Sequence, residues 1–323
     1  MSTENIQVFF ASDDKYASFL CVAMYSILKY TKSFVDFTIL DNNIKEETKT
    51  LINESLKKFD NYSIDYISVS SLGLERFPDT HNCLGGAFSR CFIPQLREDV
   101  KKALYLDVDI IAKADIKELY DIDLEDSYAG VISEDFLGFA GKFLKEKMYP
   151  DFENPDNYFC SGVMLMNTQK MRENNITEKL VNTTLELKDK LIKTPDQSIL
   201  NIVLENKVKY IDYKYNYYPD GNHYYIKKFG LERAKEIKNN AIIYHFTGGK
   251  PWYGLSSASN EFFSLAKETL FKDKIQKVYD DYMKKTFKKR MLQKLFSIKN
   301  EYDEFGNKVK CITVLGLKSK FNK

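Results

Sequence analysis

The sequence is poor in cysteine and has no long apolar segment. Its five cysteines are an odd number, and none stands in a Cys-x-x-Cys pair, the spacing used by thiolate zinc sites. No apolar run approaches the roughly 18 residues that a bilayer-spanning helix needs. The N-terminus, MSTENIQVFF, has no basic region followed by an apolar one. We therefore expect a cytoplasmic protein that is neither secreted nor transmembrane.

Glycine-rich phosphate-binding loops are also missing. No Gly-x-Gly-x-x-Gly follows the first apolar segment, and no Gly-x-x-x-x-Gly-Lys occurs anywhere. Neither a dinucleotide-binding fold nor an ATPase-type phosphate loop is predicted. A phosphorylated ligand would have to be held in another way, and a divalent ion with a lysine is the natural substitute.

The chain does contain enough apolar sequence for one large core or two modest ones, since 44% of its 323 residues are hydrophobic. Runs typical of strands alternate with segments of helical periodicity, the pattern of an α/β domain with a mostly parallel sheet. We expect strands at 6–11, 37–40, 63–69, 128–133 and 163–167, and strand ends within the apolar runs 103–112 and 241–245. We expect helices at 19–28, 45–59, 87–96, 171–190 and 196–206.

Residues 103–112, ALYLDVDIIA, place Asp107 and Asp109 at the abrupt end of an apolar run. In an extended backbone, side chains two apart point the same way, so both acids can face one hard cation where a strand enters a loop. A buried strand followed by a solvated acidic turn is the alternative. Partners elsewhere in the chain must therefore decide between the two.

A matching strand end occurs at His245, which closes the apolar run 241–245 and precedes a turn containing Gly248 and Lys250. Open α/β sheets bind ligands at the carboxyl ends of their strands, so His245 is a candidate third metal ligand and Lys250 a candidate phosphate partner. A satisfied structural histidine is the alternative.

Six segments resemble, in order and spacing, the retaining glycosyltransferases of family 8, which include bacterial lipopolysaccharide galactosyl- and glucosyltransferases and glycogenin. The segments are FFASDDKYASFL, FSRCFIPQL, ALYLDVDII, YFCSGVMLMN, PDQSILN and HFTGGKPW. The resemblance covers residues 7–253 and implies a single Rossmann-like, GT-A type domain with a mostly parallel mixed sheet. It also implies transfer of glucose or galactose from a UDP-hexose donor, with retention of configuration. The acceptor would be an oligosaccharide or lipid-linked glycan in the synthesis of lipopolysaccharide, capsule or another surface glycan.

The resemblance assigns the charged residues to the metal and the diphosphate. Asp107, Asp109 and His245 match the ligands of Mn²⁺, with Mg²⁺ as an alternative ion, and mixed oxygen and imidazole ligands suit manganese better than calcium. Arg90 matches a residue that reaches the donor sugar and phosphates. Lys250 matches one that neutralises the leaving diphosphate. For Arg90 and Lys250, the alternative is an ordinary salt bridge on the surface.

Other matches surround the rest of the donor. Ala11, Asp13 and Tyr16 match positions around the uracil and ribose, although a helix-capping acid and a core aromatic are the ordinary fates of the last two. Four residues should lie near the sugar. Among them, Gly162 would let the backbone approach the sugar closely, and Asp196 would accept hydrogen bonds from the sugar hydroxyls. Asp196 is otherwise a first-turn acid favoured by the helix dipole. The four are Ser161, Gly162, Asp196 and Gln197, and the remaining donor positions are Val108 and Gly248.

Gln197 matches the family residue closest to the sugar face opposite the leaving group, and it joins Asp196, Lys250 and Arg90 in the predicted catalytic set. Because an amide is a weak nucleophile, we favour a same-face route over double displacement. The acceptor hydroxyl would attack as UDP departs, and a diphosphate oxygen would take its proton.

Two acids and two departures from the family pattern bear on the acceptor and donor. Glu134 and Asp135 lie where the family has an acid near the acceptor, so they are candidates for orienting the incoming hydroxyl; an exposed acidic loop is the alternative. Cys160 and Lys15 each replace an asparagine of relatives.

Charge is concentrated at the C-terminus. Residues 283–323 hold eleven lysines and one arginine against three acids, a net charge of +9 that leaves −7 for the rest. A stripe at helical spacing among these lysines could lie on the inner face of the cytoplasmic membrane, or pack on the core. The stripe consists of Phe287, Met291, Leu292, Leu295 and Phe296. Val309, Ile312, Val314 and Leu317 should form a small apolar cluster or a short strand. No nucleic-acid partner is expected, because nothing else forms a basic groove with stacking aromatics.

We divide the chain into a nucleotide-sugar-binding catalytic domain at 1–255, a helical extension packed on it at 256–282, and a basic amphipathic tail at 283–323. Two other functions stay open, an Asp-x-Asp phosphatase of the haloacid-dehalogenase type and a non-catalytic sugar-nucleotide-binding module. The phosphatase motif normally lies near the N-terminus and continues with Thr or Val where this chain has Ile111. No metal acid is missing, which argues against the binding module.

Overall fold

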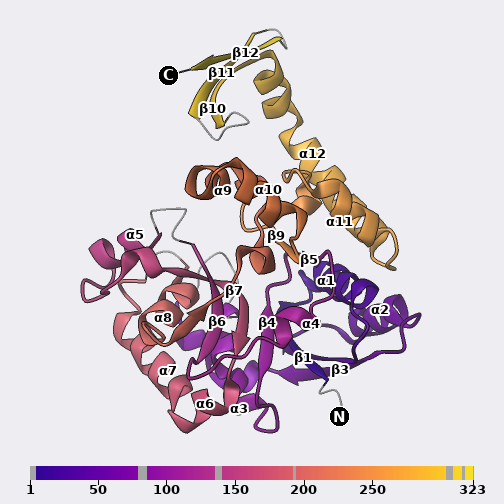
Figure 1. Cartoon of the computed structure of the whole chain (residues 1–323). Coiled ribbons are helices and arrows are strands. Elements are labelled where there is room, and N and C mark those ends of the chain that lie inside the picture. Colours follow the sequence, from indigo (N-terminus) through magenta and orange to yellow (C-terminus); the bar gives the residue numbers. More distant parts are fainter. Residues whose placement is uncertain are drawn as a thin grey trace.

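A mixed seven-stranded sheet forms the centre of the molecule (Figure 1). The computed structural model describes residues 5–78, 86–134, 140–191, 194–302, 308–314 and 317–322. In spatial order the strands are β3 (Tyr62–Ser68), β2 (Val35–Asn42), β1 (Ile6–Asp13), β4 (Ala103–Leu106), β7 (Phe159–Met166), β6 (Ala129–Ser133) and β8 (Val208–Tyr210). Only β7 runs antiparallel to its neighbours, β4 and β6. The mostly parallel mixed sheet expected from the sequence is confirmed.

The sheet is buried on both faces because successive side chains of a strand point to opposite sides. In β1, Val8 and Phe10 belong to one hydrophobic cluster, whereas Phe9 belongs to the other. The first cluster contains apolar residues of α1 (Ala17–Tyr30), α2 (Glu46–Leu56), α4 (Lys117–Tyr120) and α11 (Ser259–Ala266). The second contains apolar residues of α3 (Ile93–Leu96), α5 (Ala140–Lys147), α6 (Thr168–Glu173), α7 (Ile176–Leu187) and α8 (Pro195–Val203). This arrangement leaves the strand ends as the place for polar chemistry.

Asp107 and Asp109 lie where a strand enters a turn, as the sequence predicted, and a second short strand follows them. The chain leaves β4 after Leu106, turns at residues 108–109, and resumes as β5 (Ile110–Ala112). Strand β5 pairs with β9 (Ile243–His245) in a separate antiparallel ribbon, with Ile110 opposite His245. Two carboxylates inside a sheet buried on both faces would lose their hydration, so the chain turns where they occur.

The predicted helix at 171–190 is wrong as a single element. The chain forms α6 and α7 with a break at Asn174 and Asn175, and Asn175 has a positive φ of 53°. Asparagine adopts that left-handed conformation more readily than most residues, and it ends the helical path there. The 87–96 segment begins as a 3-10 helix, η3 (Gly86–Phe92), before α3.

A third, smaller hydrophobic cluster lies beside the ribbon. It joins Cys160 to Tyr217, Tyr218 and Tyr225 and to apolar residues of α10 (Leu231–Asn239). The 3-10 turn η6 (Tyr213–Asn216) leads into this cluster, and α9 (Asn222–Phe229) follows it. Backbone hydrogen bonds from Tyr217 to Ile243 and from His245 to Tyr217 attach the segment to β9.

The C-terminal part is a long helix that carries a small sheet. Helix α12 (Lys272–Leu295) passes through residue 282, so the boundary that we placed there falls inside a helix. Beyond it, β10 (Phe296–Tyr302), β11 (Lys308–Val314) and β12 (Leu317–Asn322) form a three-stranded antiparallel sheet. Figure 1 shows this sheet beyond the main body, at the far end of α12.

The apolar residues of the tail are only partly where the sequence predicted them. Phe296 begins a strand rather than continuing the helical stripe, and Phe287 is 64% exposed. Val309, Ile312 and Val314 lie in β11 and Leu317 begins β12, so this segment forms strands, one of the two expected outcomes. The side chains of Val314 and Leu317 are exposed. The side chains of Met291, Leu292, Leu295 and Val309 lie outside the described residues. Among the described residues, no helix is both long enough and apolar enough to cross a bilayer.

Candidate active site

The two acids and the histidine predicted as metal ligands are held by backbone pairing at the end of β4. The N–H of Asp107 donates to the carbonyl oxygen of Gly162 on β7 at 2.8 Å. The N–H of Phe246 donates to the carbonyl oxygen of Asp109 at 2.9 Å. The first bond fixes Asp107 to the main sheet and the second fixes Asp109 to the ribbon, so the turn between them brings both carboxylates to His245.

Side-chain atoms of these three residues converge on one point. His245 Nε2 lies 3.3 Å from Asp109 Oδ1 and 3.9 Å from Asp107 Oδ2. One ligand atom from each residue lies within 4.8 Å of the others. Two carboxylate oxygens and an imidazole nitrogen form a donor set that fits a divalent transition ion. The geometry is therefore that of a metal site open to further ligands.

Lys250 and His245 lie against the carboxylate of Asp109. Lys250 Nζ donates to Asp109 Oδ2 and, at 2.8 Å, to the carbonyl oxygen of Phe246. Burial would raise the pKa of Asp109, but His245 and Lys250 together lower it below its usual range. Burial would likewise lower the pKa of His245, but Asp109 raises it. Because a metal binds the unprotonated imidazole nitrogen, cation binding at this site is linked to proton release.

Arg90 connects the acids to the sugar side of the site. Its buried guanidinium donates to Asp107 Oδ1 at 3.0 Å and to the carbonyl oxygen of Ser161 at 2.8 Å, and it lies 3.4 Å from Asp196 Oδ2. It also covers the ring of Tyr105 at 4.3 Å. Arg90 is thus a buried bridge rather than a surface salt bridge, and its pKa is raised by Asp107 and Asp196 despite the opposing effect of burial. Its donors are largely occupied by the protein itself.

Gly162 is required by the metal ligands. A Cβ at this position would lie 2.4 Å from His245 Cε1 and 2.6 Å from Asp107 Oδ2. Those separations are far below an ordinary carbon contact of about 3.5 Å. From the sequence we assigned this glycine to close approach of the sugar, whereas the structure shows that its bare Cα makes room for two side chains of this protein.

Asp196 and Gln197 lie in the first turn of α8, after Pro195 at the helix start. Gln197 Oε1 accepts from the backbone N–H of Ser161 at 3.0 Å, and Gln197 Nε2 donates to Glu134 Oε2 at 2.9 Å. Glu134 is only 8% exposed, so the exposed-loop alternative is wrong for this residue. Burial raises the pKa of its carboxyl group, although hydrogen bonds from Tyr218 and Gln197 oppose the shift. Asp135 lies outside the described residues.

The residues predicted for the nucleotide lie where β1 leads into α1. Asp13 Oδ1 accepts from the backbone N–H of Tyr16 at 2.9 Å, which is the capping contact considered as the alternative role. Tyr16 packs edge-on against Phe19 and Trp252 and stays partly exposed. Ala11 and Val108 are also partly exposed, and a Cβ on Gly248 would meet open space. These surfaces remain accessible to a ligand.

Sequence reasoning missed three polar residues of the site: Tyr105, Asn216 and Tyr218. Tyr105 hydroxyl donates to Asp107 Oδ1 at 2.9 Å, and its position two residues before that acid was a usable signal. Asn216 and Tyr218 contact His245 and Glu134, respectively. They come from a tyrosine-rich segment that has no periodic pattern, so only the fold reveals their proximity.

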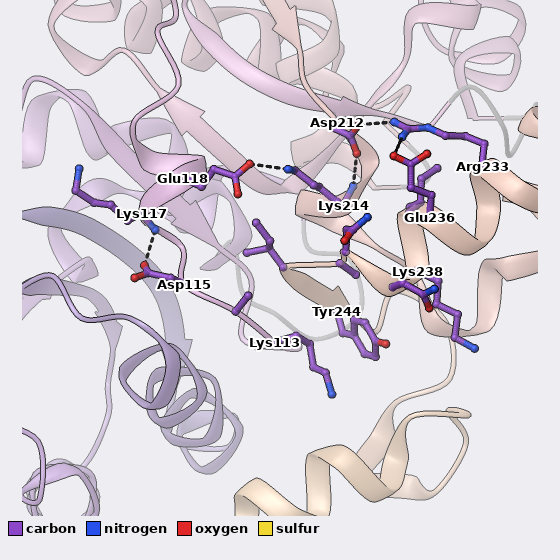
Figure 2. Close-up of a pocket in the computed structure, with 16 residues that line it drawn as sticks. Lys113, Asp115, Lys117, Glu118, Asp212, Lys214, Arg233, Glu236, Lys238 and Tyr244 are labelled. Atoms are coloured by element: carbon purple, nitrogen blue, oxygen red, sulfur yellow. Dashed lines mark hydrogen bonds and ion pairs between the residues drawn. The ribbon is translucent and has the colours of Figure 1, made fainter.

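A cavity of about 720 Å³ lies elsewhere, between the segment after β5, η6 and α10 (Figure 2). Its walls carry paired charges, including Lys214 with Glu118 and Arg233 with Asp212 and Glu236. None of the predicted site residues lines it. The candidate active site is therefore a convergence of side chains at the strand ends and is distinct from this cavity.

The chain belongs to glycosyl transferase family 8, whose model matches residues 7–255. This membership sets aside the phosphatase and the non-catalytic alternatives and identifies a glycosyltransferase. A putative glycosyltransferase of Haemophilus influenzae is 29% identical over 260 residues, which are 80% of this chain and 76% of that protein. A lipopolysaccharide 1,2-glucosyltransferase of Escherichia coli is 27% identical over 80% of this chain and 77% of its own length.

A similarity among solved structures supports the GT-A type fold. The galactosyltransferase LgtC, solved in complex with donor and acceptor sugar analogs, matches with a TM-score of 0.69. The match covers 82% of this chain and 96% of that chain, at 24% identity. The fold expected from the sequence is confirmed.

Proposed function

We propose that this glycosyltransferase moves a hexose from a UDP-sugar to a glycan acceptor, with retention of configuration and with Mn²⁺ at Asp107, Asp109 and His245. The observation that carries the proposal is the Arg90 bridge, which contacts Asp107 of the candidate metal site and Asp196 of the candidate sugar site. The Arg90 guanidinium thereby fixes the distance between Asp107, at the end of the site that would bind the diphosphate, and Asp196, at the end that would bind the sugar hydroxyls. A nucleotide sugar has these two ends in the same order.

Bound at the three ligands, Mn²⁺ would act as a Lewis acid toward the diphosphate of the donor. Lys250 would add a second positive charge as UDP leaves. Its side chain is 32% exposed, so the ammonium group can turn from Asp109 toward a phosphate without crossing the core. Asp13 and Tyr16 would contact the nucleoside, since both side chains are partly exposed.

We favour a same-face reaction because of the state of Gln197. Its amide oxygen accepts from the Ser161 N–H, and its nitrogen donates to Glu134. An amide in that environment is a poor nucleophile, so a glycosyl–enzyme bond would form only at high cost. In the same-face route the acceptor oxygen bonds to the anomeric carbon as the bond to the diphosphate breaks, and the acceptor proton passes to a diphosphate oxygen. Glu134 would help to place the acceptor.

The test is a survey of UDP release with Mn²⁺ and a set of UDP-hexoses and UDP-N-acetylhexosamines. NMR of the glycosidic product then gives the anomeric configuration. We expect UDP release with one donor or a narrow group of donors, and a product with the configuration of the donor. An inverted product would refute the retaining mechanism. Cation-independent release would refute the metal assignment.

We further propose that residues 283–323 attach the enzyme to anionic lipid at the inner face of the cytoplasmic membrane, where a lipid-linked acceptor would be found. The support is the net charge of +9 together with the exposed side chains of Phe287, Val314 and Leu317. Apolar side chains that enter the membrane interface and lysines that contact anionic headgroups both contribute to the free energy of membrane binding.

A further inference from the structure

A continuous chain of hydrogen bonds runs behind the candidate active site. His245 Nδ1 lies 2.8 Å from Asn216 Oδ1. Asn216 Nδ2 donates to the Tyr218 hydroxyl at 3.3 Å, and that hydroxyl donates to Glu134 Oε1 at 2.7 Å. Glu134 Oε2 accepts from Gln197 at 2.9 Å. The chain of hydrogen bonds therefore joins His245, a candidate metal ligand, to Gln197 of the candidate sugar site.

The first link determines which imidazole nitrogen is free. An amide oxygen can only accept, so the proton of a neutral imidazole ring is held at Nδ1 and the lone pair is left on Nε2. Nε2 is the atom that faces Asp109 and Asp107. Metal-bound histidines commonly donate their second nitrogen to such an acceptor, which fixes the orientation of the ring. Asn216 is 1% exposed, so water does not compete for this contact.

The second part of the chain determines the position of Glu134. Tyr218 is 5% exposed and supplies a donor to one carboxylate oxygen, while Gln197 supplies a donor to the other. A buried carboxylate is stable only when its oxygens accept hydrogen bonds. Loss of either donor would let the carboxylate turn, and the Gln197 amide would turn with it.

We propose that Asn216 and Tyr218 are positioning residues, one for the cation site and one for the sugar site. Asn216 holds the His245 ring for metal binding, and Tyr218 holds Glu134 and, through it, Gln197. Both roles rest on the proposed function, because they need a cation at one end of the chain of hydrogen bonds and a donor sugar at the other.

The experiment uses the full-length protein with Asn216→Leu, Asn216→Asp and Tyr218→Phe. The control is Tyr217→Phe, because the Tyr217 hydroxyl contacts Asn222 and lies outside the chain of hydrogen bonds. Mn²⁺ binding is measured without nucleotide by electron paramagnetic resonance, and thermal unfolding without metal reports folding. UDP release gives kcat and KM for the donor.

For Asn216→Leu we expect Mn²⁺ affinity to fall by roughly 10- to 100-fold, the range found when such supporting contacts are removed. Asn216→Asp keeps the acceptor and should bind Mn²⁺ within about threefold of the parent, because a carboxylate also orients a metal-bound imidazole. Tyr218→Phe should leave Mn²⁺ affinity nearly unchanged but lower kcat by at least about tenfold, since a misplaced sugar-facing group costs that much or more. Tyr217→Phe should change neither.

Parental Mn²⁺ affinity in folded Asn216→Leu, or equal kcat in Tyr218→Phe and Tyr217→Phe, would overturn the positioning roles while leaving the proposed function standing. If the parent protein binds no divalent ion and releases no UDP, the proposed function fails and this inference fails with it. Should Asn216→Leu not fold, Asn216→Ala removes the same acceptor with less bulk, and the same two criteria apply.

Discussion

Gly162→Ala is the sharpest perturbation of the candidate metal site, because it adds one methyl group between two ligands. The new Cβ would lie 2.4 Å from His245 Cε1 and 2.6 Å from Asp107 Oδ2. To restore a contact of about 3.5 Å, the ligands must separate from the backbone by roughly 1 Å. Metal–ligand distances tolerate only about 0.2 Å, so a displacement of that size should remove the site.

We expect Mn²⁺ affinity in Gly162→Ala to fall by about 100-fold or more and UDP release to fall at least as far, as a 1 Å misplacement typically costs in catalysis. The free energy of unfolding should fall by only about 1–3 kcal/mol, the usual cost of overpacking a buried position. Cation titration by electron paramagnetic resonance and chemical denaturation measure the two effects separately.

Gly130→Ala is the matched control, since Gly130 lies in β6 of the same sheet. Its nearest contact would be a Leu124 methyl group at 3.0 Å, the mobile end of a side chain. It should lose some stability and keep Mn²⁺ affinity. Parental Mn²⁺ affinity in Gly162→Ala would refute the reasoning, because the bare Cα of Gly162 would then not be what admits the ligands.

Three further predictions concern the charges. Asp109→Asn should abolish metal-dependent UDP release while circular dichroism shows an intact fold, because Lys250 can turn to solvent; normal turnover would disprove the metal assignment. Arg90→Lys should lower the free energy of unfolding by about 2–4 kcal/mol, because lysine cannot replace the forked contacts to Ser161 and Asp107. It should also slow UDP release. Unchanged chemical denaturation and unchanged turnover would contradict the bridging role of Arg90. Truncation after Lys285 keeps the stacking of Tyr282 on Tyr253. The shortened protein should sediment less with anionic vesicles but still hydrolyse the donor. Equal vesicle binding with and without residues 286–323 would refute the proposed membrane attachment.

The elements of the main sheet were largely predictable, because their patterns are local. The strand at the N-terminus was expected from an apolar run and the helix after it from helical spacing, and they were found as β1 and α1. The break at Asn175 was not expected, since a single left-handed residue leaves hydrophobic periodicity on both sides intact. The second strand of the segment 103–112, β5, was not expected, because its pairing with β9 has no local signal of its own.

The candidate site was predictable where a strand end carried an unusual polar residue. Asp107, Asp109 and His245 met that condition, and the structure brings their ligand atoms together. The reasoning that placed both acids on one face of an extended strand was nevertheless wrong, because a turn follows Asp107. The contacts of Arg90, Asn216 and Tyr218 arise from packing between distant segments, which single-sequence patterns do not encode.

The ribbon of β5 and β9 has a consequence for assembly. Its strands are only three residues long, yet Asp109 and Lys250, which it brings into contact, are 141 positions apart. The coordinating pocket therefore does not exist until most of the polypeptide has emerged and folded back on its first half. A divalent ion that binds only this folded form raises the free energy of unfolding, and a tighter-binding ion raises it more.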